Sequence, residues 1–182
     1  MTASCVPVLI QQNVNGSKFF NRSWAEYKVG FNDTRGSYWL GNDLLSQLTL
    51  SRRYKLRFDL QARNLSWYYA EYSSFTVSGE SRNYELHVSG YSGNIGGDSL
   101  SDHNGMMFTT YDRDNDPWIS IRRYNNNCAV AYGGGFWYKH CHLCHVNDGL
   151  GRDCFYWVAL VPPDAPQTER LYLQSTRMWL TC

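Results

Sequence analysis

The stretch YELHVSGYSGNIGGDSLSDHNGMMFTTYDRDND occupies residues 84–116 and combines two different patterns. Tyr84, Leu86 and Val88 alternate with polar residues, which predicts a strand with one buried face. From Ser89 to Asn127 almost nothing is periodic, and Gly, Asn, Asp and Ser predominate. An irregular segment this long in a compact domain needs something that holds it in place or a function that uses it. The stretch therefore predicts a sheet followed by a loop region that is ordered by other means.

Upstream and downstream, the pattern predicts short helices and further strands. Ser23 and Glu26 have the spacing of a capping box, and Gly30 suits the end of the helix that they begin. A second short helix is expected at 42–48. Alternation and β-propensity predict the other strands at 54–61, 67–77, 84–89 and 170–180. Together these elements predict an α+β fold with an antiparallel central sheet.

Composition and charge exclude several classes of protein. The 182 residues suit a single domain that is large enough to bury its own core. Net charge is +1, and no basic run is longer than the pairs Arg52-Arg53 and Arg122-Arg123, so no broad basic field would attract nucleic acid. No apolar run approaches the roughly 18 residues that a membrane span needs, so no insertion into a membrane is expected.

Two features together favour an extracellular glycoprotein. The cysteine count of six is even, which is typical of disulfide-bonded chains. Four sequons for N-glycosylation occur, at Asn15, Asn21, Asn32 and Asn64. The first residues lack the order of a signal peptide, so any leader is expected to have been removed from this chain.

The aspartates in YDRDNDPW suggest a cation site. Asp112, Asp114 and Asp116 alternate, and carboxylates two residues apart in a loop can converge on Ca²⁺, which takes six to eight oxygen ligands. An EF-hand is excluded because Pro117 and Arg123 stand where that loop needs Gly and Glu. A polar turn with solvated aspartates is the alternative that the triplet alone leaves open.

The stretch KHCHLCH, residues 139–145, has three possible uses. Its two cysteines and three histidines could bind zinc, act in catalysis or serve a disulfide. No nucleophile elbow, HExxH helix, phosphate-binding loop or dinucleotide fingerprint occurs in the chain, so an enzyme is not expected. The run Gly133-Gly134-Gly135 precedes aromatic residues instead of a helix and is not a phosphate site.

Several blocks resemble the fibrinogen-related domain family in order and spacing. They are FFNRSWAEYKVGF, SYWLGND, LRFDL, AEYSSFTV, residues 84–116 and CAVAYGGGFWYKHCH. The resemblance runs from about Val8 to His142, with a weaker match at Trp157 and in RLYLQSTRMW. It implies one secreted domain over 1–182, truncated at the N-terminus. Within that domain it implies a central sheet region at 6–100 and 170–182 and an irregular calcium- and ligand-binding loop region at 101–169.

The resemblance also implies a disulfide, a cis peptide and a calcium site. In the family, a disulfide corresponds to Cys128–Cys141, and a cis peptide precedes the second cysteine, here His140-Cys141. A Cys141 engaged in this way has no thiolate for zinc. The matching calcium ligands are the carboxylates of Asp114 and Asp116 and the main-chain carbonyls of Trp118 and Ser120.

Three departures from the family pattern affect these expectations. PWISIRRYNNN contains an insertion, so the carbonyl ligands could instead be those of Tyr124 and Asn126. Cys144 and Cys154 have no family counterpart, and we suggest that they pair in a segment that is shorter than usual. The remaining pair, Cys5 and Cys182, would then join the two ends of the chain.

Family members of the ficolin and tachylectin type bind acetylated sugars, and this resemblance implies innate-immune glycan recognition here. The implied ligand-binding residues are Tyr132, Trp137, His140, Cys141 and His142. Tyr132 and Trp137 could instead belong to the core, His142 could be structural, and His140 and His145 are expected at the surface. His103 is attributed to loop architecture.

The alternative is a protein-binding module of the angiopoietin and fibrinogen kind, which recognises a receptor or peptide. In that case a broad surface with exposed aromatic residues such as Trp118 or Tyr124 is expected. The chain contains no collagen-like or coiled-coil segment, and the sequence leaves a homo-oligomer open.

Overall fold

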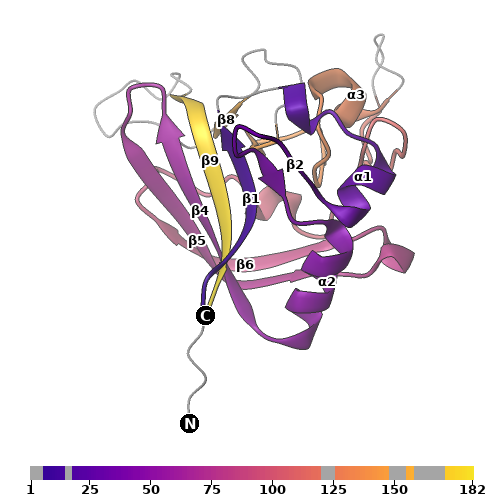
Figure 1. Cartoon of the computed structure of the whole chain (residues 1–182), viewed down its shortest axis with the longest axis horizontal. Helices are drawn as coiled ribbons and strands as arrows, with labels where there is room; N and C mark the ends of the chain where they lie inside the picture. Colours follow the sequence, from indigo (N-terminus) through magenta and orange to yellow (C-terminus); the bar gives the residue numbers. More distant parts are fainter. Residues whose placement is uncertain (1–5, 15–17, 120–125, 148–154, 158–170) are drawn as a thin grey trace.

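The computed structural model describes residues 6–14, 18–119, 126–147, 155–157 and 171–182. Within these residues, the central feature is an antiparallel sheet with the strand order β2-β3-β1-β9-β4-β5-β6 (Figure 1). β1 and β9, from the two ends of the chain, are neighbours in its middle. The strands are β1 (Val8–Val14), β2 (Phe31–Asn32), β3 (Tyr38–Trp39), β4 (Tyr54–Ala62), β5 (Trp67–Val77), β6 (Leu86–Gly93) and β9 (Leu171–Thr181).

The helices are short, as expected. They are α1 (Trp24–Val29), α2 (Asn42–Ser51) and α3 (Cys128–Tyr132), with 3-10 turns η1 (Lys18–Phe20), η2 (Glu80–Arg82) and η3 (Ser101–His103). None of the described helices has the length and apolar character needed to cross a bilayer. The expected antiparallel sheet with short helices is confirmed.

The alternation in β4 gives the sheet one buried face. Leu56, Phe58 and Leu60 are fully buried. Lys55, Arg57 and Asp59, which alternate with them, are half-buried on the other face. Burial of such apolar side chains contributes about 1.5–3 kcal/mol each. α2 packs against β5 on this buried face of the sheet. Because successive side chains of a strand point to opposite faces, apolar residues occur at every second position.

The capping box at the start of α1 is present. Ser23 accepts a hydrogen bond from the backbone N–H of Glu26, and the Glu26 carboxylate accepts one from the Ser23 N–H. Gly30 ends the helix at φ +91°, where a Cβ atom would lie 2.5 Å from the carbonyl oxygen of Leu40. Only glycine therefore fits this position without displacing backbone.

Several predicted boundaries differ from the structure. β6 continues to Gly93, so the segment expected to be irregular from Ser89 begins as a strand, and β4 and β9 each end one residue later than expected. The strand expected from Tyr84 begins at Leu86, because Tyr84 has φ +51° and its hydroxyl donates to Asp43 at 2.5 Å. α2 continues to Ser51 instead of ending at Leu48.

β1 was not predicted as a strand, because its buried face carries polar residues. Gln11 and Asn13 are fully buried, and both donate to the carbonyl oxygen of Val146, at 2.9 and 3.0 Å. Gln11 also donates to Asn147 Oδ1 at 3.0 Å. These bonds fasten the segment after KHCHLCH to the middle of the sheet.

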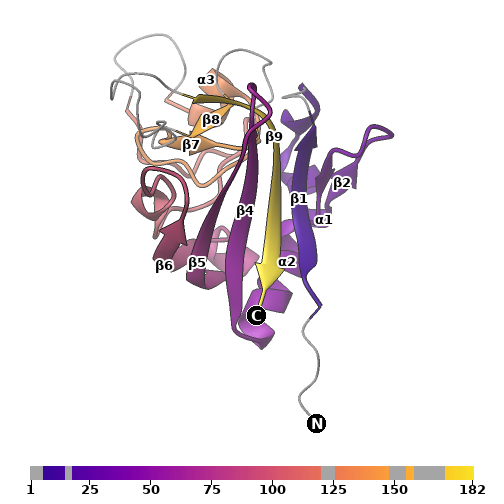
Figure 2. The same ribbon diagram turned by 90° about the vertical axis from the view of Figure 1, so that its left-hand side faces the viewer.

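The irregular region lies at the end of the sheet away from Cys182 (Figures 1 and 2). It contains α3 and a small antiparallel ladder of β7 (Cys144–His145) with β8 (Tyr156–Trp157), and β8 also pairs with β9. The ladder connects this region to the central sheet.

Candidate functional site

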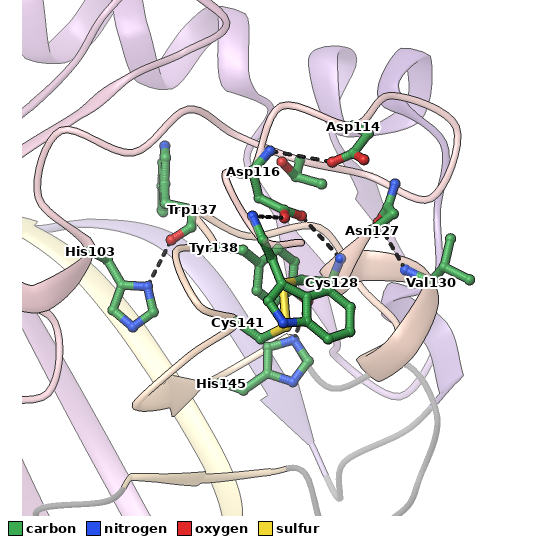
Figure 3. Close-up of a disulfide and its surroundings, with 12 residues drawn as sticks. His103, Asp114, Asp116, Asn127, Cys128, Val130, Trp137, Tyr138, Cys141 and His145 are labelled. Atoms are coloured by element: carbon green, nitrogen blue, oxygen red, sulfur yellow. Dashed lines mark hydrogen bonds between the residues drawn. A yellow bond between two sulfur atoms is a disulfide. The ribbon is translucent and has the colours of Figure 1, made fainter. Parts of the chain in front are cut away.

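A disulfide joins Cys128, the first residue of α3, to Cys141 (Figure 3). The two Cα atoms are 5.3 Å apart, within the usual range for a disulfide. The pairing is the one that the family resemblance implies. Because Cys141 is oxidised, KHCHLCH serves a disulfide and cannot offer two thiolates to zinc.

The peptide bond between His140 and Cys141 is trans, so the predicted cis bond is wrong. Cys141 instead has φ +24°, a backbone conformation that few residues other than glycine adopt. The chain turns into the disulfide through this strained residue. The strain is therefore located beside the predicted ligand residues.

His103 holds the segment that contains Cys141 against η3. The imidazole is fully buried, and its Nδ1–H donates to the carbonyl oxygen of Trp137 at 2.7 Å. Its Nε2 accepts from the backbone N–H of Leu143 at 3.2 Å. Burial lowers the pKa of His103, so the neutral form that these two bonds require is favoured. The expected architectural role of His103 agrees with these contacts.

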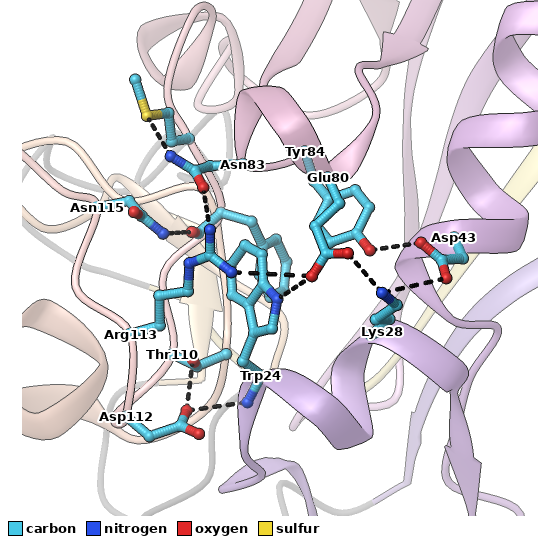
Figure 4. A network of polar contacts seen from close by, with 12 residues as sticks. Trp24, Lys28, Asp43, Glu80, Asn83, Tyr84, Thr110, Asp112, Arg113 and Asn115 are labelled. Carbon is cyan, nitrogen blue, oxygen red and sulfur yellow. Dashed lines mark hydrogen bonds and ion pairs between the residues drawn. The ribbon is translucent and has the colours of Figure 1, made fainter.

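Asp112 attaches the aspartate loop to α1 (Figure 4). Its Oδ1 accepts from the backbone N–H of Trp24 at 2.9 Å and from the hydroxyl of Thr110 at 2.7 Å. The guanidinium of Arg113 lies 4.0 Å from the centre of the Trp24 ring and donates to Asn83 Oδ1 at 2.6 Å. These contacts within the protein hold this side of the loop against α1.

A second set of polar contacts extends from Trp24. The indole N–H donates to Glu80 at 2.9 Å, and Lys28 pairs with the same carboxylate (Figure 4). The hydrogen bond from Lys28 lowers the pKa of Glu80, so its carboxylate is charged in this network. α1, η2 and the loop are therefore joined around one tryptophan.

Asp114 and Asp116 lie together at the end of the loop that faces α3 (Figure 3). The backbone N–H of Asp116 donates to Asp114 Oδ1 at 3.3 Å. The Asp116 carboxylate accepts from the backbone N–H groups of Trp118 and Cys128, both at 3.0 Å. Asp116 thus connects the loop to the start of α3 and to the disulfide.

Burial raises the pKa of Asp116 to about 6, and the Asp114 carboxylate adds to the effect. Among the described residues, no lysine or arginine pairs with either aspartate. Two adjacent carboxylates without a cationic side chain fit an oxygen-preferring cation such as Ca²⁺. Of the carbonyl ligands expected, those of Trp118 and Asn126 belong to described residues. Ser120 and Tyr124 lie outside them.

Tyr132 and His142 form the part of the predicted ligand site that the structure brings together. Their ring centres are 4.5 Å apart and the rings are nearly perpendicular. Tyr132, at the end of α3, is half-buried, and His142 is 9% exposed. The disulfide links α3, which ends at Tyr132, to Cys141, the residue before His142, so it keeps the two rings close together. The structure therefore brings a partly exposed tyrosine into edge-to-face contact with a buried imidazole.

Trp137 and His140, which were also predicted to bind the ligand, do not lie together with Tyr132 and His142. Trp137 is fully buried, and its indole N–H donates to the carbonyl oxygen of Tyr84 at 2.7 Å, so it cannot contact a ligand. The prediction of Trp137 as a ligand residue is therefore wrong, because its side chain completes the core. His140 is exposed, as expected for a surface group.

Three further residues surround His142 in the structure. His145 was expected at the surface but is fully buried, and it stacks on His142 with ring centres 4.7 Å apart. Its Nε2 is 2.8 Å from the hydroxyl of Tyr138. The ring of Tyr156 lies 5.2 Å from that of His142. The spacing of His142 and His145 within KHCHLCH was the available signal, but it did not distinguish a buried pair from a surface pair.

The glycine run has a packing role. Gly134 has φ +81°, and a Cβ there would lie 1.8 Å from the carbonyl oxygen of Asn147. The backbone N–H of Gly135 donates to the Tyr27 hydroxyl at 2.8 Å. The run therefore lets the chain pass close to the site segment and to α1.

The two other predicted disulfides, Cys144–Cys154 and Cys5–Cys182, have different outcomes. Cys144 is a free, fully buried thiol that donates to the carbonyl oxygen of Ser99 at 3.6 Å. The predicted Cys144–Cys154 bond is therefore wrong for Cys144, whose side chain is enclosed in the core; Cys154 lies outside the described residues. Cys182 is disulfide-bonded, and Cys5, its predicted partner, also lies outside them.

The fold and the disulfide-bonded loop region define a fibrinogen-like globular domain. Residues 2–157 match the family described as fibrinogen beta and gamma chains, C-terminal globular domain, and the chain belongs to that family. It is 41% identical to mouse tenascin over 157 residues, which are 82% of this chain and 7% of tenascin. It is 39% identical to human ficolin-3 over 140 residues, which are 77% of this chain and 45% of ficolin-3.

Two solved structures are similar in fold. The fibrinogen-like globe domain of human ANGPTL6 has a TM-score of 0.79 and 31% identity, covering 94% of this chain and 76% of that one. Lamprey fibrin D-dimer, solved with the peptide Gly-His-Arg-Pro-amide, has a TM-score of 0.77 and 28% identity, covering all of this chain and 62% of that one. The chain spans less than two thirds of the length of tenascin and ficolin-3.

Proposed function

We propose that this chain is a secreted, non-enzymatic recognition domain that binds acetylated glycans with the help of Ca²⁺. The observation that carries the proposal is the pair of rings at Tyr132 and His142. A partly exposed tyrosine is in edge-to-face contact with a buried imidazole, beside a disulfide and a strained backbone turn. A small neutral group such as an acetyl is captured by an apolar wall with a few fixed polar atoms.

Calcium would be held by Asp114 and Asp116 with main-chain carbonyls from the same loop. When bound, it would supply positive charge between two carboxylates that otherwise repel each other. Asp116 also accepts from the N–H of Cys128, so the position of the cation site is coupled to α3, which carries Tyr132. Ligand binding is therefore expected to weaken when calcium is removed.

Secretion and glycosylation are supported by surface exposure. Asn21, Asn32 and Asn64, the sequon asparagines among the described residues, are all exposed. An exposed side chain is what N-glycosylation requires. The disulfide adds the expectation of an oxidising compartment.

A glycan array with and without a chelator tests the proposal. Binding to N-acetylated sugars should be lost with EDTA and in Tyr132→Ala. Tyr38→Ala, which changes a half-buried tyrosine in β3, is the control and should bind normally. An array on which the folded protein binds no acetylated sugar would overturn the glycan assignment.

Peptide or protein recognition is the second candidate, favoured by apolar side chains near the same site. Val130 in α3 and Leu143, two residues after Cys141, are 43% and 39% exposed. Trp118 is half-buried against the core, so it offers less surface than this alternative expected. Titration with Gly-His-Arg-Pro-amide, the peptide in the lamprey structure, tests this candidate. Saturable binding that Leu143→Asp abolishes would favour it, and no heat at high peptide concentration would count against it.

A further inference from the structure

A groove of about 560 Å³ lies where the C-terminal end of α2 meets β4 and β5. It is distinct from the site at Tyr132, since its lining comes from residues 49–54 and 73–76. Arg52 and Arg53, one of the two basic pairs in the sequence, contribute to it together with Tyr54. None of the lining residues is acidic.

The two arginines are exposed and unneutralised. Within the described part of the chain, neither guanidinium forms an ion pair or a hydrogen bond, whereas the neighbouring Lys55 lies 3.5 Å from Glu71. The guanidinium of Arg52 lies 5.7 Å from the centre of the Tyr54 ring, so a cation–π contact holds it beside another residue of the groove. A cation near a helix C-terminus is favourable in itself, but neither side chain bonds the last carbonyls of α2. Their charge is thus available to a ligand.

A β-bulge in β5 brings two serines into the lining of the groove. Tyr54 is opposite Phe75 and Leu56 is opposite Tyr72, so Ser73 and Ser74 together face one residue of β4. Both serines are exposed, and neither hydroxyl has a hydrogen-bond partner among the described residues. Bulges often redirect side chains beside binding sites.

We propose that this groove binds a sulfated oligosaccharide. Guanidinium groups donate paired hydrogen bonds to sulfate oxygens, and the serine hydroxyls can bond to sulfate or to sugar hydroxyls. A peptide is a poorer fit, because β4 and β5 are both paired on their two edges and offer it no free backbone. The volume of the groove exceeds what a single inorganic anion would fill.

The test is surface plasmon resonance with a heparin-derived octasaccharide and its desulfated counterpart. The double variant Arg52→Gln/Arg53→Gln should bind the sulfated probe about tenfold more weakly. Arg35→Gln/Arg82→Gln removes the same charge from two exposed arginines outside the groove and should bind like the parent. Arg52→Lys/Arg53→Lys, which keeps charge without the planar donor pair, should fall between them.

Several results would overturn the proposal. They are equal affinity of the parent and the Arg52/Arg53 variant, an equal loss in the control, and binding that desulfation leaves unchanged. A phosphotyrosine peptide that displaces the octasaccharide at lower concentration would also contradict it. Tyr132→Ala should retain the sulfated probe, so failure of the acetyl-binding site and failure of this groove are distinguishable.

Discussion

At the scale of a single residue, the surroundings of Asp116 have opposing effects on its carboxylate. Its carboxylate accepts two backbone hydrogen bonds that order the loop, yet burial and Asp114 raise its pKa from 3.8 to about 6. A raised acid pKa means that the folded, metal-free protein binds the proton more tightly than the unfolded chain does. That contribution to stability is present below about pH 3.8 and is lost as the pH rises through about 6.

Calcium should bind Asp116 more readily at neutral pH, where the carboxyl has already lost its proton. The increase in melting temperature on adding Ca²⁺ is therefore expected to be larger at about pH 7.5 than at about pH 5, where the cation must displace a proton. Differential scanning fluorimetry with Ca²⁺ or EDTA at each pH measures it. Asp114→Asn/Asp116→Asn is the control and should show no calcium response. An equal increase at both pH values would contradict the account.

Cys144 should be unreactive in the folded protein. It is fully buried, and burial raises the pKa of its thiol well above the ordinary value, so almost no thiolate forms at neutral pH. Iodoacetamide should modify Cys144 only after denaturation, as followed by peptide mass mapping. Rapid labelling without denaturant, or a recovered peptide in which Cys144 is disulfide-bonded, would count against the structure at this position.

At the scale of elements, Asp112 joins α1 to the aspartate loop. Asp112→Ala removes the acceptor for the Trp24 N–H and the Thr110 hydroxyl and should lower the free energy of unfolding by about 1–2 kcal/mol. Asp112→Asn keeps an Oδ1 acceptor and should lose less. Urea denaturation compares the two, and equal losses would show that these hydrogen bonds contribute little.

Elements were predictable where local pattern and burial agree. The capping box at Ser23 and the alternation in β4 depend on neighbours in sequence, so the prediction of α1 and of that strand succeeded. β1 was missed because Gln11 and Asn13 are buried, and their partner, Val146, is more than 130 positions away. No local pattern contains that information.

At the scale of the whole molecule, the disulfide connects the irregular region to itself and orders α3. Cys128→Ser/Cys141→Ser should lower the free energy of unfolding by about 3 kcal/mol on the chain-entropy account of a short closed loop. Ligand binding should weaken by more than the loss of stability explains, because the disulfide joins the two chain segments that carry Tyr132 and His142. Urea denaturation and array binding measure the two effects. An unchanged array signal would show that ligand binding does not depend on the disulfide.

The candidate site was predictable in part, for a reason of tertiary structure. Cys128, Cys141, Tyr132 and His142 follow from the family resemblance and meet in the structure. The burial of Trp137 and of His145 depends on contacts with Tyr84 and Tyr138 that spacing does not specify. The trans peptide at His140-Cys141 likewise reflects the local path of the chain.

The antiparallel pairing of the first and last strands has a geometric consequence. Val8 is opposite Leu180, so both described ends leave from one pole of the sheet, while α3, β7 and β8 occupy the other pole (Figures 1 and 2). A surface or a fused partner attached through either end would sit behind the domain. The loops around Tyr132 would then face away from the point of attachment, where a ligand in solution could reach them.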